Sequence, residues 1–312
     1  MRYYPLSRFF RERFGFRVCK IPVHAGFTCP NRDGTIGEKG CIFCWNPSFS
    51  PALGDHPVSL RAQIAAGKAS VKRKDKCKFL VYFQTFTNTY APVEKLRWVY
   101  DAALEDPDVI GLCIGTRPDC VPDPVLDLLA GYARKWHIWL EYGLQSAHDR
   151  TLLLINRGHT RADFEDAVVR SQGRGLFLCT HVILGLPGET REDMLETALF
   201  LSSQPIQGVK IHHLQVIEHT PLAELYRKEQ VQPLSFKEYV SLVCDFLELL
   251  RPDLTIHRLV GEVLDSSYLL APRWGVGKAQ VLNAVEKELE LRRSRQGLKW
   301  QQAGNDPVPG KH

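Results

Sequence analysis

The chain is organised around the stretch Cys29-Pro-Asn-Arg-Asp-Gly-Thr-Ile-Gly-Glu-Lys-Gly-Cys41-Ile-Phe-Cys44, which places three of its nine cysteines close together. Thiolates are soft ligands that suit iron–sulfur clusters, zinc or copper(I). The close pair Cys41 and Cys44 can hold one metal centre from a single tight turn, whereas Cys29 must return to that centre across a loop. Glycine, Asn and Asp residues in the loop permit such a return. The stretch therefore predicts a site built on three thiolates.

The number three leaves the nature of this site open. A closed structural zinc site needs four ligands, and His24 could complete a set of three cysteines and one histidine. A [4Fe–4S] cluster on three cysteines instead leaves one iron free to bind another molecule. A disulfide framework without metal is a third interpretation. The spacing favours a cluster, and the rest of the chain has to decide.

Length and composition indicate an ordinary globular protein. The 312 residues are enough for one large α/β barrel or two smaller domains, and 44% of them are hydrophobic. No apolar run approaches the roughly eighteen residues of a membrane-spanning helix, and the first residues lack the apolar stretch of a secretory signal. An odd number of cysteines in such a chain argues for a reducing, cytoplasmic location.

The net charge of +5 is mildly basic, and the basic residues are grouped. The groups are Arg2, Arg8, Arg11, Arg13 and Arg17; Lys68, Lys72, Arg73, Lys74, Lys76 and Lys78; and Arg292, Arg293, Arg295, Lys299 and Lys311. The aromatic residues that interleave with the first group are Tyr3, Tyr4, Phe9, Phe10, Phe14 and Phe16. This mixture is typical of RNA contact through phosphate pairing and base stacking. Solvated charged faces and a packed aromatic N-terminus are the alternative.

Strand and helix patterns alternate along the chain. Short apolar runs predict strands at 17–23, 79–83, 109–114, 138–144, 176–184, 208–216 and 254–259. Helices are expected at 58–73, 92–104, 123–133, 148–155, 161–172, 191–203, 220–228, 235–250 and 278–295. Thr160 and Thr190 are the expected N-caps of two of them. This order predicts an α/β fold with a parallel sheet and right-handed crossovers, and the absence of a G-x-G-x-x-G motif favours an open barrel over a dinucleotide-binding domain.

Polar residues follow the predicted strands at the point where each strand ends. Besides the cysteine stretch, they occupy residues 84–88, 116–119, 141–146 and 183–189. In barrels of this kind, the chemistry lies at the C-terminal ends of the strands, so these segments should converge on one mouth. A zinc knuckle predicts no such convergence, which strengthens the cluster hypothesis.

The sequence resembles the radical SAM superfamily and, within it, the YhcC-like family, which is related to elongator-type and methylthiotransferase tRNA-modifying radical SAM enzymes. The stretches that carry the resemblance are KIPVHAGFTCPNRDG, GCIFC, TNTYAP, IGTRPDC, EYGLQSAHD, INRGHT, HVILGLPGETREDM and TIHRLVG. They cover nearly the whole chain. The C-x11-C-x2-C spacing is the longer variant of the superfamily's C-x3-C-x2-C motif.

The resemblance implies a partial (β/α)6 TIM-type barrel with short terminal extensions. We expect an N-terminal basic and aromatic extension at 1–16, the radical SAM core barrel at 17–260, and a C-terminal helical extension and tail at 261–312. Cys29, Cys41 and Cys44 would hold one [4Fe–4S] cluster. Its free iron would bind S-adenosylmethionine (SAM), whose reductive cleavage gives a 5′-deoxyadenosyl radical that abstracts hydrogen from the substrate.

The resemblance also suggests residues that contact SAM. Gln84, Thr87 and Asn88 lie where the superfamily has a Gly-Gly-Glu motif for the SAM amino group, which is absent here in its literal form. Arg157 is the candidate for the SAM carboxylate by charge pairing. Glu141 and Gln145 are the expected contacts of the ribose or the methionyl end of SAM. Ile183 and Gly185 are expected to lie against the adenine, and His181 is expected to face the cavity.

The function implied is that of a radical SAM enzyme that modifies tRNA at the side chain of a wobble uridine. Its partners would be SAM, tRNA and an electron donor such as flavodoxin or ferredoxin, with no membrane involved. Two alternatives remain: the same chemistry on a small-molecule or protein substrate, and a zinc-stabilised RNA-binding module without catalysis. The loop between Cys29 and Cys41 would act as a lid over the cluster, positioned by Asn31, Arg32 and Asp33.

Overall fold

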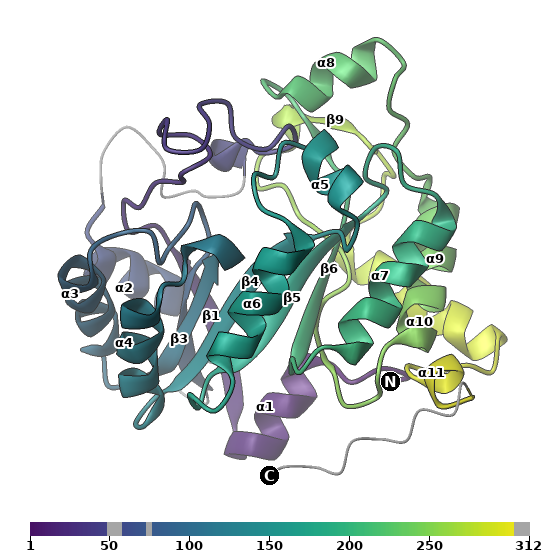
Figure 1. Ribbon diagram of the computed structural model, residues 1–312. Coiled ribbons are helices and arrows are strands. Elements are labelled where there is room, and N and C mark those ends of the chain that lie inside the picture. Colours follow the sequence, from purple (N-terminus) through teal and green to yellow (C-terminus); the bar gives the residue numbers. More distant parts are fainter. Residues whose placement is uncertain (49–57, 73–76, 303–312) are drawn as a thin grey trace.

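Seven parallel strands form one sheet in the computed structural model, which describes residues 1–48, 58–72 and 77–302 (Figure 1). The sheet order is β1-β2-β3-β4-β5-β6-β8, so neighbours in the sheet follow chain order. The strands are β1 (Arg17–Val23), β2 (Cys77–Phe83), β3 (Val109–Thr116), β4 (His137–Gln145), β5 (Phe177–Leu184), β6 (Gly208–His213) and β8 (Thr255–Arg258). This arrangement confirms the predicted α/β fold of a partial barrel.

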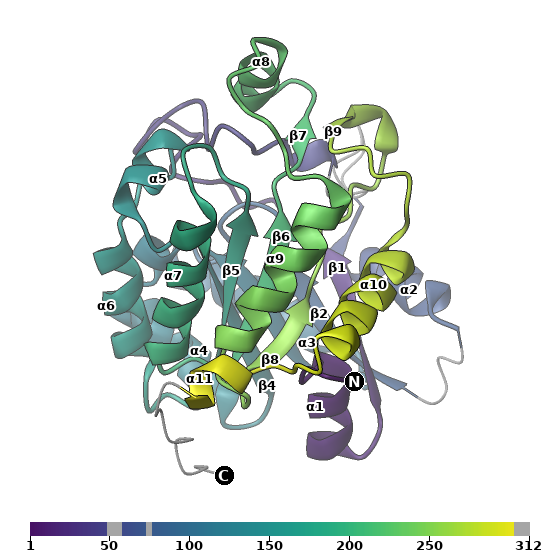
Figure 2. The same ribbon diagram turned by 90° about the vertical axis from the view of Figure 1, so that its right-hand side faces the viewer.

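Helices cover the outer face of the curved sheet (Figures 1 and 2). They are α2 (Leu60–Ser70), α3 (Val93–Leu104), α4 (Asp123–Ala133), α6 (Arg161–Ser171), α7 (Arg191–Ser203), α9 (Phe236–Leu249) and α10 (Lys278–Leu291). The main apolar core lies between this layer and the sheet and includes the fully buried Leu112, Leu140 and Val182. A second, smaller apolar cluster, which includes Leu80, Trp139 and Cys179, belongs to the same strands and is separate from this core.

Local signals in the sequence set several helix starts. The hydroxyls of Thr160 and Thr190 accept hydrogen bonds from the backbone amides of Asp163 and Asp193, as predicted for these two N-caps. Each aspartate carboxylate in turn accepts a bond from the backbone amide of its threonine. Ser235 forms a third capping box at the start of α9. Each box satisfies two backbone donors that a helix start would otherwise leave unpaired.

The chain departs from the predicted elements at the mouth of the barrel. The strand expected at 208–216 ends at His213, and β7 (Val216–Ile217) pairs instead with β9 (Leu269–Ala271) in a separate antiparallel sheet (Figure 2). Short elements complete this end of the molecule. They are η1 (Asn46–Ser48), η4 (Pro118–Cys120), α5 (Asp149–Leu154), α8 (Pro221–Arg227) and η5 (Ser266–Tyr268).

The opposite end of the barrel is closed by α1 (Leu6–Phe14), a helix that we did not predict (Figure 1). Phe10 is buried, and the Phe9 ring lies 5.5 Å from the ring of Trp139 and 5.7 Å from that of Phe177. Tyr3 is also buried. The prediction that the N-terminal aromatic residues stack on RNA bases is therefore wrong for Tyr3 and Phe10, because these side chains pack inside the protein.

Acidic partners neutralise part of each basic group. Lys68 pairs with Asp106 and Asp108, and Arg292 pairs with Asp245. Arg73, Lys74, Lys76 and Lys311 lie outside the described residues. The helices of the described segments, α11 (Leu298–Gln302) included, contain none that is long and apolar enough to cross a membrane.

Candidate active site

The cysteine loop, the segment between β1 and η1, lies at the end of the sheet where the strands end (Figure 1). Three other parts of the chain hold its backbone. The Thr87 amide donates to the Thr28 carbonyl at 3.0 Å, the Ile42 amide donates to the Ile155 carbonyl at 3.1 Å, and the Leu222 amide donates to the Ile42 carbonyl at 2.9 Å. The loop is therefore fixed to the barrel mouth on several sides.

Within the loop, the residues between Cys29 and Cys41 fold onto themselves. The Cys29 carbonyl accepts bonds from the amides of Arg32 and Asp33 at 2.8 and 3.1 Å, and the Gly40 amide donates to the Asn31 carbonyl at 2.7 Å. Gly40 has a φ of +70°, and a Cβ atom there would lie 2.7 Å from the Arg32 side chain. Glycine suits that position because its backbone adopts the left-handed region without strain, and a side chain would also have to displace Arg32.

The Cys41 thiol faces a basic and an amide donor at the mouth. Cys41 is buried, and its sulfur lies 3.5 Å from Nη1 of Arg157 and 3.8 Å from Nδ2 of Asn31. Burial raises the pKa of the Cys44 thiol to about 11, and the neighbouring Cys41 and Cys29 contribute to this rise. Cys44 is thus electrostatically coupled to the other two cysteines, and Arg157 and Asn31 place N–H groups beside the Cys41 sulfur.

The structure bears on two of the alternatives for these cysteines. All nine cysteines are free thiols, so the disulfide interpretation is wrong. Among the described residues, two groups of ligand atoms lie within 4.8 Å of one another, and neither contains Cys29, Cys41, Cys44 or His24. His24 instead places Nδ1 3.1 Å from Oγ1 of Thr85. The three thiols therefore do not converge with His24 on a single ion as a zinc knuckle requires.

The predicted residues at the end of β2 divide between two environments. Gln84 lines the cavity described below. Asn88 is buried, and its Nδ2 donates to the carbonyls of Phe83 and Gly115 at 3.2 and 2.7 Å, which ties the ends of β2 and β3 together. Thr87 is also buried, and Oγ1 has no partner among the described residues.

The predicted residues at the ends of β4 and β5 lie on both sides of the cavity wall. Gln145 and Ile183 line the cavity, and Gln145 adopts a positive φ of 79° where the pairing of β4 with β5 shifts register. Gly185 lies behind this wall, since a Cβ atom there would lie 3.2 Å from the Leu234 side chain. The Gly185 amide donates to the Met194 sulfur at 3.0 Å.

Arg157 links the cysteine loop to β4. Its Nε and Nη2 donate to the Gly143 carbonyl at 3.1 and 2.7 Å, while Nη1 faces the Cys41 sulfur. The Arg157 carbonyl accepts a bond from Nη1 of Arg117 at 2.6 Å, and Arg117 is paired with Asp119. Arg157 is thus held in place by backbone groups and keeps a cationic edge beside the cysteine site.

Glu141 lies at the centre of a buried charged cluster inside the barrel. The carboxylate is fully buried, with Oε1 2.6 Å from Nζ of Lys20 and Oε2 2.7 Å from Nε2 of His181 and 3.3 Å from Nζ of Lys210. Burial alone would raise the pKa of Glu141, but Lys20 and Lys210 hold it well below its usual value. The charged form is therefore stable at neutral pH despite complete burial.

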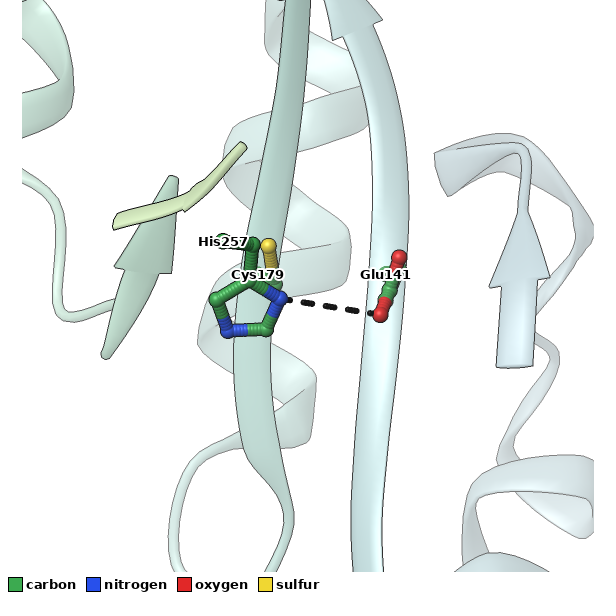
Figure 3. A group of neighbouring side chains, drawn as sticks. All are labelled: Glu141, Cys179 and His257. Carbon is green, nitrogen blue, oxygen red and sulfur yellow. Dashed lines mark ion pairs between the residues drawn. The ribbon is translucent and has the colours of Figure 1, made fainter. Parts of the chain in front are cut away.

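The same cluster contains a set of atoms that could bind a metal, namely those of Glu141, Cys179 and His257 (Figure 3). Nζ of Lys20 lies 3.2 Å from Nδ1 of His257 as well as beside Glu141. An ammonium group thus already bridges two of the three ligands. We therefore interpret this group as a lysine-neutralised cluster and not as a metal site.

A cavity of about 210 Å³ connects the cysteine loop with the charged cluster. Phe43 and Cys44 come from the loop and Asn46 from η1, while the strands contribute Tyr82, His181, Lys210, His212 and Arg258. This cavity is the space at the strand ends in which a ligand can lie against both the cysteine site and the inner face of the sheet.

Sequence reasoning missed Lys20, Lys210 and Arg258. Lys20 and Lys210 are single charges inside otherwise largely apolar strands, and each calls for a partner of opposite charge if buried. That signal was present for both lysines, as it was for Glu141. Their pairing could not be predicted because it depends on the register of strands that are distant in sequence.

Two protein-family models match most of the chain. The family model described as "Radical SAM superfamily" matches residues 29–201, and "Radical_SAM C-terminal domain" matches residues 206–291. Members of this superfamily use a [4Fe–4S] cluster and SAM.

Two relatives that match most of this chain have names without an activity. The uncharacterized protein YtqA of Bacillus subtilis is 42% identical over 301 residues, which cover 96% of this chain and 93% of YtqA. Protein YhcC of Escherichia coli is 39% identical over 264 residues, 84% of each chain. A tRNA uridine(34) acetyltransferase of Dehalococcoides mccartyi is 26% identical over 157 residues, which cover 49% of this chain and 34% of the acetyltransferase.

A solved structure supports the fold. The archaeal Elp3 of Methanocaldococcus infernus, with an N-terminal deletion, superimposes with a TM-score of 0.68 at 19% identity. The match covers 94% of this chain and 69% of that chain. At this identity the similarity shows the shared barrel and no more.

Proposed function

This chain belongs to the radical SAM superfamily, and from that membership we propose that it is an enzyme that modifies the side chain of a wobble uridine in tRNA. Cys29, Cys41 and Cys44 would hold the [4Fe–4S] cluster, and SAM would lie in the cavity beside Cys44. The observation that carries the proposal is the position of three free thiols on one loop at the barrel mouth, with Cys44 in the wall of the cavity.

The residues present suit a three-cysteine cluster. Soft sulfur ligands are appropriate for iron, and Arg157 and Asn31 supply donors toward the Cys41 sulfur at 3.5 and 3.8 Å. Hydrogen bonds to the ligating sulfurs and shielding from solvent are the main means by which a protein adjusts such a centre. When bound, the cluster supplies the electron for reductive cleavage of a carbon–sulfur bond of SAM.

The chain's own residues would then bind and orient SAM. Arg157 can offer its outward edge to the carboxylate of SAM, since its other nitrogens are fixed on the Gly143 carbonyl. Gln84, Gln145 and Ile183 line the cavity and are suited to contact the rest of the molecule. Thr87, Asn88 and Gly185 would stabilise the ends of the strands that carry these cavity residues. Glu141 and His181 would hold the charged side chains beneath the cavity in place.

The choice of tRNA rests on relatives and not on the basic groups. The match to a tRNA uridine(34) acetyltransferase covers about half of this chain. An electron donor such as flavodoxin or ferredoxin would reduce the cluster. Free thiols throughout the chain suit a cytoplasmic protein, because an oxidising compartment favours disulfides.

Anaerobic reconstitution tests the chemistry. Wild-type protein should bind about four iron ions per chain and cleave SAM when dithionite is added. The matched control is Cys19→Ala, which alters a half-buried cysteine on β1 outside the loop and should retain both properties. A protein that binds one zinc ion and leaves SAM intact would refute the proposal.

Nucleoside analysis tests the substrate. We expect tRNA from a deletion strain to contain an altered wobble uridine, measured by mass spectrometry, and to regain the normal nucleoside when the gene is restored. An unchanged nucleoside profile, together with SAM cleavage by the purified enzyme, would instead assign the chemistry to a small-molecule or protein substrate.

A further inference from the structure

The cavity beside Cys44 has an excess of positive charge on its strand side. The cavity is lined or underlain by three basic side chains, those of Lys20, Lys210 and Arg258. The one carboxylate that lies beside them is that of Glu141. The remaining titratable rings are uncharged at neutral pH: burial lowers the pKa of His181 to about 4 and holds that of His212 well below its usual value. Three cations therefore face a single anion.

The charges are not equally satisfied. Nζ of Lys20 is taken up by Glu141 at 2.6 Å and by His257 at 3.2 Å. Lys210 donates to the Tyr82 hydroxyl and lies 3.3 Å from Glu141, a longer and weaker contact. Glu141 is thus mainly engaged with Lys20 and His181, and Lys210 retains bonding capacity toward the cavity.

Arg258 has no partner at all among the described residues. Its guanidinium lines the cavity from β8, yet it forms no hydrogen bond and no ion pair in residues 1–48, 58–72 and 77–302. Arg258 and Lys210 are also paired in register on neighbouring strands, so two cations stand side by side. Burial lowers the pKa of Lys210 to about 8, and Arg258 contributes to this decrease.

We propose that Arg258 and Lys210 form the binding site for an anionic group, a carboxylate or a phosphate, of the substrate. A planar guanidinium can bind either group through two parallel hydrogen bonds. An ammonium group beside it adds a second charge-assisted bond, and the bound anion relieves the repulsion between the two cations. The inference rests on the proposed function, since the anion would anchor the substrate in the cavity where SAM is cleaved.

The anion belongs to the substrate and not to SAM because the protein offers SAM another cation. Arg157 stands 3.5 Å from the Cys41 sulfur, beside the proposed cluster. Arg258 comes from the last strand of the sheet and forms no hydrogen bond with any of the three cysteines. The two arginines thus provide separate sites for two anions, one at the cluster and one at the strand floor.

Calorimetry on the full, cluster-loaded chain without reductant tests this assignment. Acetate and inorganic phosphate are the probes, each titrated with and without saturating SAM. We expect one of them to bind the wild type, and Arg258→Gln to weaken that binding about ten- to hundredfold, the range for a lost charge-assisted pair. Arg258→Lys should restore part of the affinity because it keeps the charge. The matched control is Arg97→Gln, an exposed arginine on α3 that should bind the probe like the wild type.

Each outcome bears on the proposal. Stronger binding of acetate or of phosphate supports it and identifies the chemical class of the substrate group. Equal affinity in wild type and Arg258→Gln, with unchanged circular dichroism, overturns it. Loss of probe binding when SAM is added also overturns it, because the anion would then be the SAM carboxylate. Wild-type SAM cleavage is measured in parallel, so that a failure of the proposed function is recognised separately from a failure of the anion site.

Discussion

Replacing Glu141 by Gln tests how much of the fold depends on the buried charges. The substitution keeps the size of the side chain and removes the one carboxylate that Lys20, Lys210 and His181 share. The NH2 group of the new glutamine would also face an N–H group of at least one of these three residues. Removal of one partner from a buried ion pair costs about 3–5 kcal/mol, because the remaining charge has no compensation.

This loss in the free energy of unfolding corresponds to a measurable decrease in the midpoint of thermal unfolding. For a chain of 312 residues, unfolding entropies of about 2.1 cal/mol/K per residue give about 0.65 kcal/mol per degree, so the midpoint should fall by about 5–8 °C. The assay is thermal unfolding at one scan rate, followed by circular dichroism at about pH 7. The control is Glu12→Gln, which breaks a solvent-exposed pair with Arg8 and should leave the midpoint unchanged.

The pH dependence gives a second check on the same variant. Lys20 and Lys210 hold the pKa of Glu141 well below its ordinary value of 4.5. A carboxyl group with a lowered pKa contributes stability that is present above its ordinary pKa and disappears as the pH falls through the lowered one. The difference in unfolding midpoint between wild type and variant should therefore be largest near neutral pH and should become smaller in acid. A variant that unfolds at the wild-type temperature at neutral pH would refute the interpretation of a carboxylate-centred cluster.

Four further substitutions test other parts of the structure. Cys41→Ala should lose the iron of the reconstituted protein while circular dichroism stays that of the wild type; full iron content would contradict the cluster assignment. Gly111→Ala should prevent soluble expression, because its Cβ atom would lie 1.9 Å from the backbone oxygen of His137. Gly131→Ala in α4 has no neighbour within 4 Å and should raise the free energy of unfolding in urea by about 0.5–1 kcal/mol. Similar behaviour of the two variants would contradict the sheet geometry. Arg157→Gln should weaken SAM binding about tenfold or more in equilibrium dialysis, since a charge-assisted pair is lost, and unaltered affinity would remove Arg157 from the SAM site.

The sequence predicted the barrel because its signals are local. Each strand of the sheet is a short, largely apolar run followed by polar residues, and Thr160 and Thr190 mark helix starts through hydrogen bonds to residues three positions away. The helix α1 escaped prediction because its aromatic residues suggested an exposed RNA-binding segment. Their burial depends on Trp139 and Phe177, which lie more than a hundred positions along the chain.

The candidate site was predictable in part for the same physical reason. The cysteine spacing and a glutamate within an apolar strand could be recognised from neighbouring residues alone. The identity of the partners of Glu141 could not, since Lys20, His181 and Lys210 come from three different strands and meet only when the sheet curves. The lack of a partner for the Arg258 side chain among the described residues also depends on the folded arrangement and has no local signature.

The charge imbalance at the cavity floor separates a stabilising role from a binding role. A cluster that served the fold alone would be expected to match its charges, because each buried cation without a counter-charge lowers stability. Glu141 meets this requirement for Lys20, but the addition of Lys210 and Arg258 exceeds what one carboxylate can neutralise. Since the guanidinium of Arg258 forms no hydrogen bond with the described residues, its position beside Lys210 has a cost and no compensating side-chain contact in that part of the chain. An anion that enters with the substrate would supply that contact, and the stability lost in the free protein would be recovered as binding energy.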